Sequence, residues 1–312
     1  MSNVSAKPDS VFLLEQNKTR LLRRAGLIAS VRQFFDANGF AEVETPVMIK
    51  APAPEEFIEA PQAGKMFLRT SPELQMKLML AAGFEKIYQI GACFREGEFG
   101  RKHRPEFTML EWYQTGADYM DLLNFTAGML RRLAQFTNNS HTISYQGRTL
   151  DFSAEPEIIT VKEAFRRFAG TTPEAAMEAD QFDELMVTKI EPELGKGRPT
   201  FLKDYPASRS ALARLSQSDS SVAERWELYL DGIEIANAYS ELIDPAEQEA
   251  RFKEAAVVRS QNGMREYPHP TEFMQAIRAG MPESSGCALG MDRLIMIFTD
   301  ADDISQVKSP VS

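Results

Sequence analysis

The chain has 312 residues, of which 43% are hydrophobic, enough apolar material for one large core. Its 45 acidic residues exceed its 35 Lys and Arg residues, and the net charge of -10 excludes a general nucleic-acid binder. We find no signal peptide and no apolar run close to a membrane span, so we expect a cytoplasmic protein. Cys93 and Cys287 lack CxxC spacing, and the three His residues are not spaced as metal ligands. This pattern predicts reduced core thiols and no zinc site.

The first predicted element is an amphipathic helix from about Asn17 to Asn38, which ends near Gly39. A short strand follows and stops at Pro46. The apolar residues at helical spacing are Leu21, Ala25, Ile28 and Phe35. Three arginines near the start predict a solvated helix face: Arg20, Arg23 and Arg24.

A second helix is predicted to begin at Ser71-Pro72-Glu73. Serine is a good N-cap, proline suits the first turn, and a carboxylate there is favoured by the helix dipole. Glu73 therefore has a structural explanation as well as a functional one.

Two strands follow, at residues 86–90 and 106–113, joined by a polar loop that contains Gly97 and Gly100. Alternation along the second strand places Phe107, Met109, Glu111 and Tyr113 on one face. A carboxylate among aromatic side chains needs a cation nearby. Arg95 in a structural ion pair and a substrate cation both satisfy this requirement.

The middle of the chain reads as helical. A helix is expected over residues 121–136. A capping box at Thr160 and Glu163 predicts the start of a second helix, which ends at Gly170. Thr172-Pro173 predicts the start of a third helix. We expect residues 150–200 to form a small helical insertion, not a second domain. The sequence contains no P-loop and no internal repeat.

The last third predicts a hairpin at Asp231-Gly232, followed by a helix. A two-residue turn there places Glu227 opposite Ala236 and diagonal to Glu234. Residues 286–290 read as a glycine-containing strand in which Gly290 lets a ligand approach the backbone. Arg293 lies in the first turn of the next helix, where the dipole favours anions, so it is expected to meet an anion such as a phosphate.

Three segments in this order resemble the three motifs of class II aminoacyl-tRNA synthetases: residues 26–46, the run FREGEFGRKHRPEFTMLEWY at 94–113, and GCALGMDRLIMIF at 286–298. PEFTMLEWY and GIEIANAYSEL resemble the lysine branch, and the likeness covers most of residues 17–298. The resemblance implies an α/β (α+β) fold, a mainly antiparallel sheet of six or seven strands flanked by helices. We expect one catalytic domain over residues 1–312 without the N-terminal anticodon-binding barrel. In this the chain is similar to stand-alone paralogues that attach (R)-β-lysine to translation elongation factor P.

The resemblance assigns an ATP site. It implies that Arg95 and Arg293 are the catalytic arginines, that Phe107 stacks on adenine, and that His103 lies near the distal phosphates. Glu227 and Glu234 are the expected Mg²⁺ ligands. The chain reads Arg95-Glu96-Gly97-Glu98 where the family usually has Arg-Asn-Glu, so the acid that contacts adenine is either Glu98 or Glu96.

The resemblance also assigns an amino-acid site. Glu111, Tyr113 and Glu241 are implied to hold the distal ammonium, Glu73 the amine near the carboxylate, and Asn237 that carboxylate. Tyr239 and Ala238 replace the usual Phe and Gly, and Ala288, with Gly290 beside it, marks the β-lysine branch. Since strict alternation separates Glu227 and Glu234 from Asn237, Tyr239 and Glu241, we predict a bulge near Ala236 or Asn237.

The implied reaction uses ATP and Mg²⁺ to activate (R)-β-lysine or lysine as an adenylate, which a lysine of elongation factor P then accepts. The expected assembly is a homodimer through the first helix. Two alternatives remain: an enzyme that activates lysine for tRNA or another acceptor, and a non-catalytic synthetase-like binding protein. The sequence identifies no base for the transfer and no role for residues 300–312.

Overall fold

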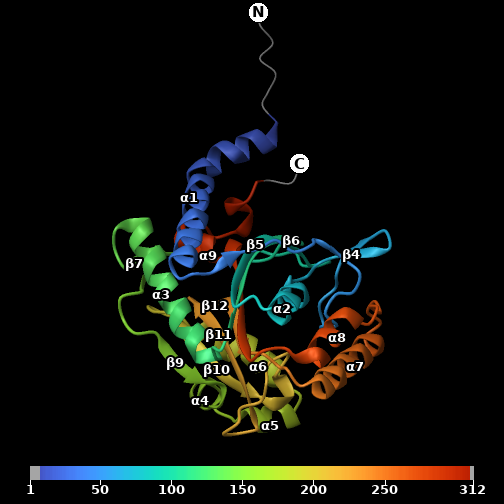
Figure 1. Cartoon of the computed structure of the whole chain (residues 1–312). Helices are drawn as coiled ribbons and strands as arrows, with labels where there is room; N and C mark the ends of the chain where they lie inside the picture. The colour runs from blue at the N-terminus through green and yellow to red at the C-terminus, as the bar shows by residue number, and fades with distance from the viewer. Residues whose placement is uncertain (1–7, 310–312) are drawn as a thin grey trace, which may run out of the picture.

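A computed structural model of the chain describes residues 8–309 (Figure 1). Its centre is an eight-stranded sheet in the order β1-β5-β6-β13-β12-β11-β10-β9. Six strands are antiparallel neighbours: β5 (Lys86–Phe94), β6 (Glu106–Thr115), β13 (Ser284–Gly290), β12 (Ile233–Ser240), β11 (Val222–Leu230) and β10 (Thr200–Pro206). The short edge strands β1 (Ala41–Glu42) and β9 (Glu157–Thr160) pair in parallel. The mainly antiparallel α/β fold is confirmed, with eight strands where six or seven were expected.

Three helices cover one face of the sheet: α1 (Asp9–Ala37), α3 (Tyr119–Asn138) and α9 (Met291–Phe298) (Figure 1). They bury the main core, which includes Leu110 and Trp112 of β6. The first helix begins earlier than expected, and its buried face contains Leu27, Val31 and Phe35. Phe35 stacks on Tyr88 with ring centroids 4.5 Å apart, so this part of the expected apolar face belongs to the core of the monomer.

The expectation that Arg24 lies on a solvated helix face is wrong. Its guanidinium forms an ion pair with the buried Asp292, with Nη1 2.5 Å from Oδ1, and donates to Thr108 Oγ1 at 2.8 Å. The same Asp292 accepts from the backbone amide of Thr108 at 2.9 Å. This contact ties α1 to β6 and α9, because one buried carboxylate is shared by all three elements.

The other face of the sheet carries α2 (Glu73–Ala81) and the pair α7 (Pro245–Gln261) and α8 (Thr271–Gly280). A small sheet beside them contains β2 (Met48–Ile49), β4 (Met66–Leu68) and β3 (Gln62–Ala63). The α2 helix begins two residues after Ser71, whose Oγ accepts from the amide of Glu73 at 3.0 Å. These elements form the wall opposite the sheet, and the candidate site lies between them.

Residues 150–200 contain a run of short helices after the hairpin of β7 (Thr142–Tyr145) and β8 (Arg148–Asp151). The helices are α4 (Val161–Ala164), η1 (Phe165–Ala169), α5 (Pro173–Glu178), α6 (Phe182–Leu185), η2 (Met186–Ile190) and η3 (Glu191–Glu193). The Thr160 capping box is present, and Gly170 ends its helix in the left-handed region at φ 69°. The segment packs on Tyr205 and Tyr229 of the main sheet in a second core cluster.

Two further short helices are η4 (Ala207–Arg209) and η5 (Ile304–Val307). No helix within residues 8–309 is long and apolar enough to cross a membrane. Cys93 and Cys287 are both buried and unpaired, which confirms the predicted core thiols.

Candidate active site

Strand register aligns the candidate residues in rows across the sheet. Glu111 on β6 pairs with Ala288 on β13, which pairs with Asn237 on β12, which pairs with Glu227 on β11. The adjacent row consists of Tyr113, Gly286, Tyr239 and Arg225. Residues in register on one face are neighbours in space. Four strands far apart in the sequence therefore build one continuous surface.

A bulge in β12 keeps both ends of this surface on the same face. Tyr229 pairs with Glu234 and Leu228 pairs with Ala236, so Ile235 is the extra residue. Glu234 and Asn237 consequently line the same cleft despite a spacing of three residues. The predicted bulge is confirmed one residue before Ala236. The expected pairing of Glu227 with Ala236 is wrong, because Glu227 pairs with Asn237.

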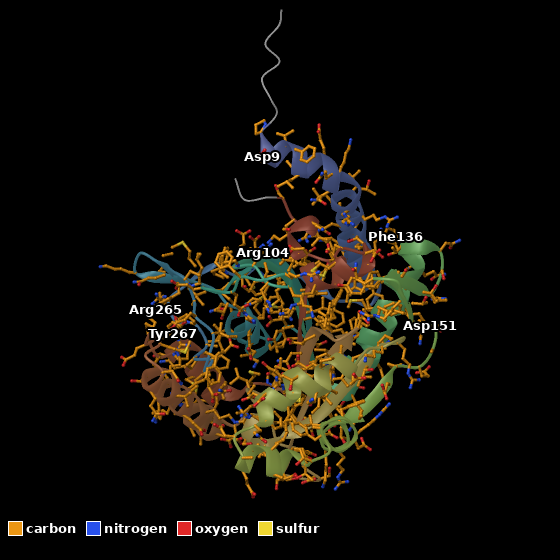
Figure 2. All side chains as sticks on the ribbon, turned by 180° about the vertical axis from the view of Figure 1, so that it is seen from behind. Asp9, Arg104, Phe136, Asp151, Arg265 and Tyr267 are labelled. Atoms are coloured by element: carbon orange, nitrogen blue, oxygen red, sulfur yellow. The ribbon has the colours of Figure 1, made fainter. Side chains whose placement is uncertain are left out.

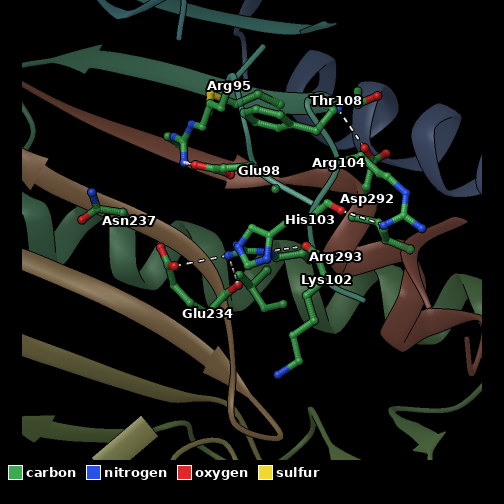
Figure 3. Close-up of a pocket in the computed structure, with 16 residues that line it drawn as sticks. Arg95, Glu98, Lys102, His103, Arg104, Thr108, Glu234, Asn237, Asp292 and Arg293 are labelled. Carbon is green, nitrogen blue, oxygen red and sulfur yellow. Dashed lines mark hydrogen bonds and ion pairs between the residues drawn. The ribbon is translucent and has the colours of Figure 1, made fainter. Parts of the chain in front are cut away.

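A cleft at one end of the surface brings together most of the residues expected to bind ATP (Figure 3). Its lining includes Arg95, Glu98, His103, Phe107, Glu234, Gly290 and Arg293, with Asn237 and Ala288 on the side toward Glu111 and Tyr239. Glu227 is the one expected ATP-site residue outside this lining. Four polar residues that sequence reasoning missed are also present: Lys102, Arg104, Thr108 and Asp292.

Arg293 is held at the mouth of the cleft by polar atoms (Figure 3). Its Nη1 donates to the backbone oxygen of Glu234 at 3.0 Å and pairs with Oε2 of the same residue at 3.2 Å. Its Nη2 lies 2.5 Å from His103 Nε2. Burial, and then the positive charge of Arg293, lowers the pKa of His103. The imidazole is therefore kept neutral beside a permanent cation.

Arg95 lies over the ring of Phe107, with its Cζ 5.2 Å from the ring centroid, and its Nη1 is 3.8 Å from Glu98 Oε1 (Figure 3). Its Nε is buried without a hydrogen-bond partner in residues 8–309. Glu96 instead pairs with Arg265 at 3.1 Å, outside the cleft lining. Of the two acids left open by the sequence, Glu98 is the one that lines the cleft.

A buried cluster of charged residues lies beside this cleft. Glu73 and Glu241 both contact the ammonium of Lys77, at 2.5 Å in the case of Glu73. The side chains of Lys77 and Glu241 are completely inaccessible to solvent. Tyr239 donates to Glu73 Oε1 at 3.1 Å, and Lys77 Nζ lies 5.6 Å from the centre of its ring. The structural explanation of Glu73 as a plain helix-start acid is incomplete, because its carboxylate belongs to this cluster.

Glu111 completes the cluster from β6. Its Oε1 accepts from Tyr113 at 2.6 Å, and its Oε2 accepts from Ser71 at 2.8 Å. Burial, and then the negative charge of Glu73, raises the pKa of Glu111 to about 7. The predicted alternation of β6 is thus confirmed, and Glu111 has no ion pair with Arg95 among the described residues.

Glu241 has an unused oxygen. Its Oε1 is buried and has no hydrogen-bond partner within residues 8–309. Gly286 leaves the space in front of it, because a Cβ at that position would lie 2.4 Å from this oxygen and 2.2 Å from a ring carbon of Tyr113. A buried carboxylate oxygen without a donor is costly, so the pocket is incomplete until a donor enters it.

The two expected magnesium ligands lie on adjacent strands. Glu227 accepts from Tyr205 at 2.5 Å, from Tyr229 at 2.6 Å and from Arg225 at 2.6 Å, which fixes its carboxylate. Burial, and then Glu227 and Glu234, raises the pKa of Glu191 to about 7. No group of three or more ligating side chains in the described part of the chain is arranged to hold a metal alone.

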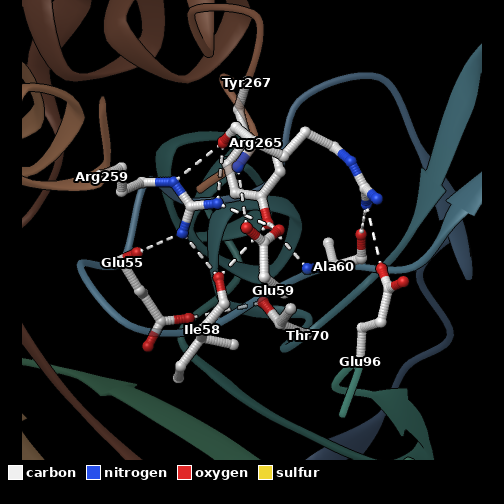
Figure 4. A network of polar contacts seen from close by, with 9 residues as sticks. All are labelled: Glu55, Ile58, Glu59, Ala60, Thr70, Glu96, Arg259, Arg265 and Tyr267. Carbon is white, nitrogen blue, oxygen red and sulfur yellow. Dashed lines mark hydrogen bonds and ion pairs between the residues drawn. The ribbon is translucent and has the colours of Figure 1, made fainter. Parts of the chain in front are cut away.

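A loop at residues 53–60, whose Glu55 interacts electrostatically with Glu73, is fixed by Arg259 of α7 (Figure 4). Arg259 Nη1 donates to the backbone oxygens of Glu55 and Ile58, both at 2.6 Å, and Nη2 pairs with Glu59 at 3.2 Å. Burial raises the pKa of the Glu55 carboxyl, although Arg95 opposes the shift. The sequence analysis identified neither this anchor nor Glu55.

Comparison with known proteins agrees with this geometry. The family model of class II tRNA synthetases (D, K and N) matches residues 11–309. The chain belongs to this family.

The similar proteins include ligases named for elongation factor P and lysine--tRNA ligases. The chain is 39% identical over 303 residues to the elongation factor P--(R)-beta-lysine ligase of Proteus mirabilis and 40% identical over 303 residues to that of Erwinia tasmaniensis. In both cases the match covers 92% of this chain and 93% of the relative. It is also 35% identical over 322 residues to the lysine--tRNA ligase of Aromatoleum aromaticum, covering 95% of this chain and 64% of that protein.

Lys77 is the most important residue that the sequence analysis missed. A signal was available: lysine is the one charged residue of the run LQMKLML, which is otherwise almost wholly apolar, and it follows Glu73 by four residues. Residues at that spacing meet on one helix face. The contact with Glu241 was not visible, because it joins α2 to a residue 164 positions later.

Proposed function

We propose that the chain is an ATP-dependent ligase that activates (R)-β-lysine, or lysine, and transfers it to a lysine side chain of translation elongation factor P. The observation that carries the proposal is the buried pocket formed by Glu73, Glu111 and Glu241 next to a cleft with two arginines. The similarity to named elongation factor P ligases over nearly their full length supports the same acceptor.

The acidic pocket suits a substrate with two ammonium groups. Glu111 and Glu241 lie on the side of Tyr113, and Glu73 lies next to Tyr239, so carboxylates are available at two positions. The unpaired Oε1 of Glu241 provides an acceptor for an incoming ammonium. Ala288 lies between Glu111 and Asn237 in the strand register, where its methyl group narrows the space next to the substrate backbone.

The arginine cleft suits a nucleotide triphosphate. Attack of a carboxylate on the α-phosphorus brings two anions together, and the free Nε of Arg95 leaves it a donor for them. Arg293 is placed to bind the distal phosphates, together with the neutral His103. Phe107, beneath Arg95, offers its ring to the adenine. Asn237 connects the cleft to the amino-acid pocket and is positioned for the substrate carboxylate.

Glu227 and Glu234 fit magnesium in part. The ion prefers oxygen ligands and commonly binds through one or two carboxylates together with substrate phosphates. Two carboxylates fit that pattern, and burial followed by the negative charges of Glu227 and Glu234 raises the pKa of the nearby Glu191. When bound, the ion would neutralise phosphate charge. The hydrogen bonds from Tyr205, Tyr229 and Arg225 would orient Glu227 toward it.

We also propose a homodimer formed through α1 and a cytoplasmic location. Leu22 is 65% exposed and Phe12 is 56% exposed on α1, and Phe136 lies beside this helix at the molecular surface (Figure 2). Exposed apolar side chains gathered on one helix favour burial against a twin. The unpaired thiols of Cys93 and Cys287 suit a reducing compartment.

ATP–pyrophosphate exchange tests the activation step. We expect exchange with (R)-β-lysine, weaker exchange with lysine and none without an amino acid, and we expect Arg293→Ala to abolish it. Transfer is then followed by the intact mass of purified elongation factor P, with a variant lacking each candidate acceptor lysine as the control. Exchange with neither amino acid would refute the activity.

Lysine--tRNA ligases are the second group of relatives, so a tRNA acceptor is tested in parallel. The same enzyme preparation is incubated with lysine tRNA and radiolabelled lysine. We expect no ester-linked product, because a net charge of -10 disfavours binding to the phosphate backbone of tRNA. Label on tRNA with none on elongation factor P would replace the proposed acceptor.

A further inference from the structure

The amino-acid pocket contains a cation of its own. Lys77 comes from α2, and its ammonium contacts Glu73 of the same helix and Glu241, which follows β12. Its side chain is fully inaccessible, so water does not screen these contacts. A buried lysine is tolerated only when carboxylates compensate for its lost hydration. Burial opposes its charged form, but Glu241 and Glu73 outweigh that effect and the pKa of Lys77 is raised.

The charges that face Lys77 can be counted by element. Helix α2 contributes Glu73, strand β6 contributes Glu111 with the neutral Tyr113, and β12 contributes Tyr239 and then Glu241. Three carboxylates against one ammonium leave an excess of two negative charges. Glu55, on the loop at residues 53–60, is outside this count, because Arg95 is the strongest charge acting on it, ahead of Glu73. The excess equals the number of ammonium groups on a diamino acid.

We propose that Lys77 is a positioning residue that sets the charge of this pocket, so that it accepts an amino acid carrying two ammonium groups. The inference rests on the proposed function, because it concerns the same amino-acid site. In the empty pocket, protons occupy the place of the missing cations, and the pKa values of Glu111 and Glu241 are raised to about 7 and about 8. Two substrate ammonium groups displace these protons, and Lys77, which contacts both Glu73 and Glu241, fixes the positions of the two carboxylates that receive them.

Lys77→Met tests this role because methionine has a similar length without the charge. Losing the cation raises the pKa of the neighbouring carboxyls, so the acidic limb of kcat/KM for the activated amino acid should move up by about 1 pH unit or more. The KM for that amino acid should rise about tenfold or more, which is the scale of one charge-assisted hydrogen bond. The KM for ATP should remain nearly unchanged. Lys77→Arg keeps the positive charge, so the acidic limb of its kcat/KM profile should lie at the same pH as in the unmodified enzyme.

Arg69→Met is the matched control. Arg69 is also buried, at 2% exposure, but it donates to the backbone oxygens of Thr45 and Ala92 and forms no ion pair among the described residues. We expect this variant to lose thermal stability without moving the acidic limb. If Lys77→Met shifts the limb no more than Arg69→Met does, Lys77 is only structural and the inference is refuted.

Calorimetry of the unmodified protein provides a test that does not depend on a variant folding. Lysine is titrated near pH 7 in two buffers of different ionisation enthalpy, and norleucine serves as the ligand with one ammonium. We expect net proton release with lysine and less with norleucine. Lysine binding without proton release would refute the charge count. Absence of exchange with lysine and (R)-β-lysine in the unmodified enzyme would instead refute the proposed function, so the two failures are distinguishable.

Discussion

Gly286→Ala adds one methyl group to the floor of the amino-acid pocket. The new Cβ would lie 2.2 Å from a ring carbon of Tyr113 and 2.4 Å from Glu241 Oε1. Both distances are about 1 Å shorter than an ordinary carbon contact. Tyr113 has no room to retreat, because it is 2% exposed and its hydroxyl donates to Glu111. Forcing an extra methyl group into a packed site costs about 1 to 3 kcal/mol.

If that cost falls on the amino-acid site, binding weakens about 5- to 150-fold. Pyrophosphate exchange at varied amino acid concentration should therefore show a raised KM for the amino acid, with little change in the KM for ATP. Gly128→Ala is the control, since the nearest atom to its new methyl group is 3.9 Å away. An unchanged KM for the amino acid in Gly286→Ala would refute the geometry of the pocket.

Four further results are expected. Ala288→Gly should shift the ratio of kcat/KM from (R)-β-lysine toward lysine by about tenfold or more, measured by competitive exchange, because it removes the methyl group that narrows the pocket. Arg259→Met should lower the free energy of unfolding by about 3 kcal/mol in urea denaturation, since it breaks a buried ion pair and removes the hydrogen bonds to three backbone carbonyls. Gly128→Ala should raise the free energy of unfolding by about 0.5 to 1 kcal/mol, because alanine is favoured over glycine inside a helix. The ligand-free protein should lose thermal stability as the pH rises toward 8. A carboxyl whose pKa is higher in the folded state than in the unfolded state stabilises the fold fully at a pH below its unfolded-state pKa. That stabilisation is lost as the pH rises through the folded-state pKa, which is about 7 for Glu111 and about 8 for Glu241. Calorimetry of Glu111→Gln should show that its thermal stability depends less steeply on pH than that of the unmodified protein. An equally steep dependence on pH would contradict the contribution assigned to Glu111.

The sequence predicted those parts of the site that depend on local periodicity. Alternation along one strand placed Phe107, Met109, Glu111 and Tyr113 on one face, and the structure confirms that arrangement. The bulge was also predictable, because strict alternation conflicted with a single site for residues on the same strand. The face on which a strand side chain lies depends on its position among consecutive residues, so the sequence alone could predict it.

The contacts that were missed join segments distant in the chain. Lys77 meets Glu241, Arg24 meets Asp292, and Arg259 meets the loop at residues 53–60. No spacing rule links such residues, because their distance is decided by how the helices pack on the sheet. Sequence alone therefore assigned arginines such as Arg24 to solvent by default, whereas the fold gives them buried partners.

The extra residue in β12 has a consequence for insertions and deletions. Side chains on a regular strand share a face only at even offsets, yet Glu234 and Asn237 are separated by three positions. Deleting Ile235 would barely change the composition of the strand, but it would turn either Glu234 or the residues after it toward the helices α3 and α9. In the proposed enzyme, the adjacency of nucleotide and amino acid would thus depend on an aliphatic residue that takes no part in the chemistry.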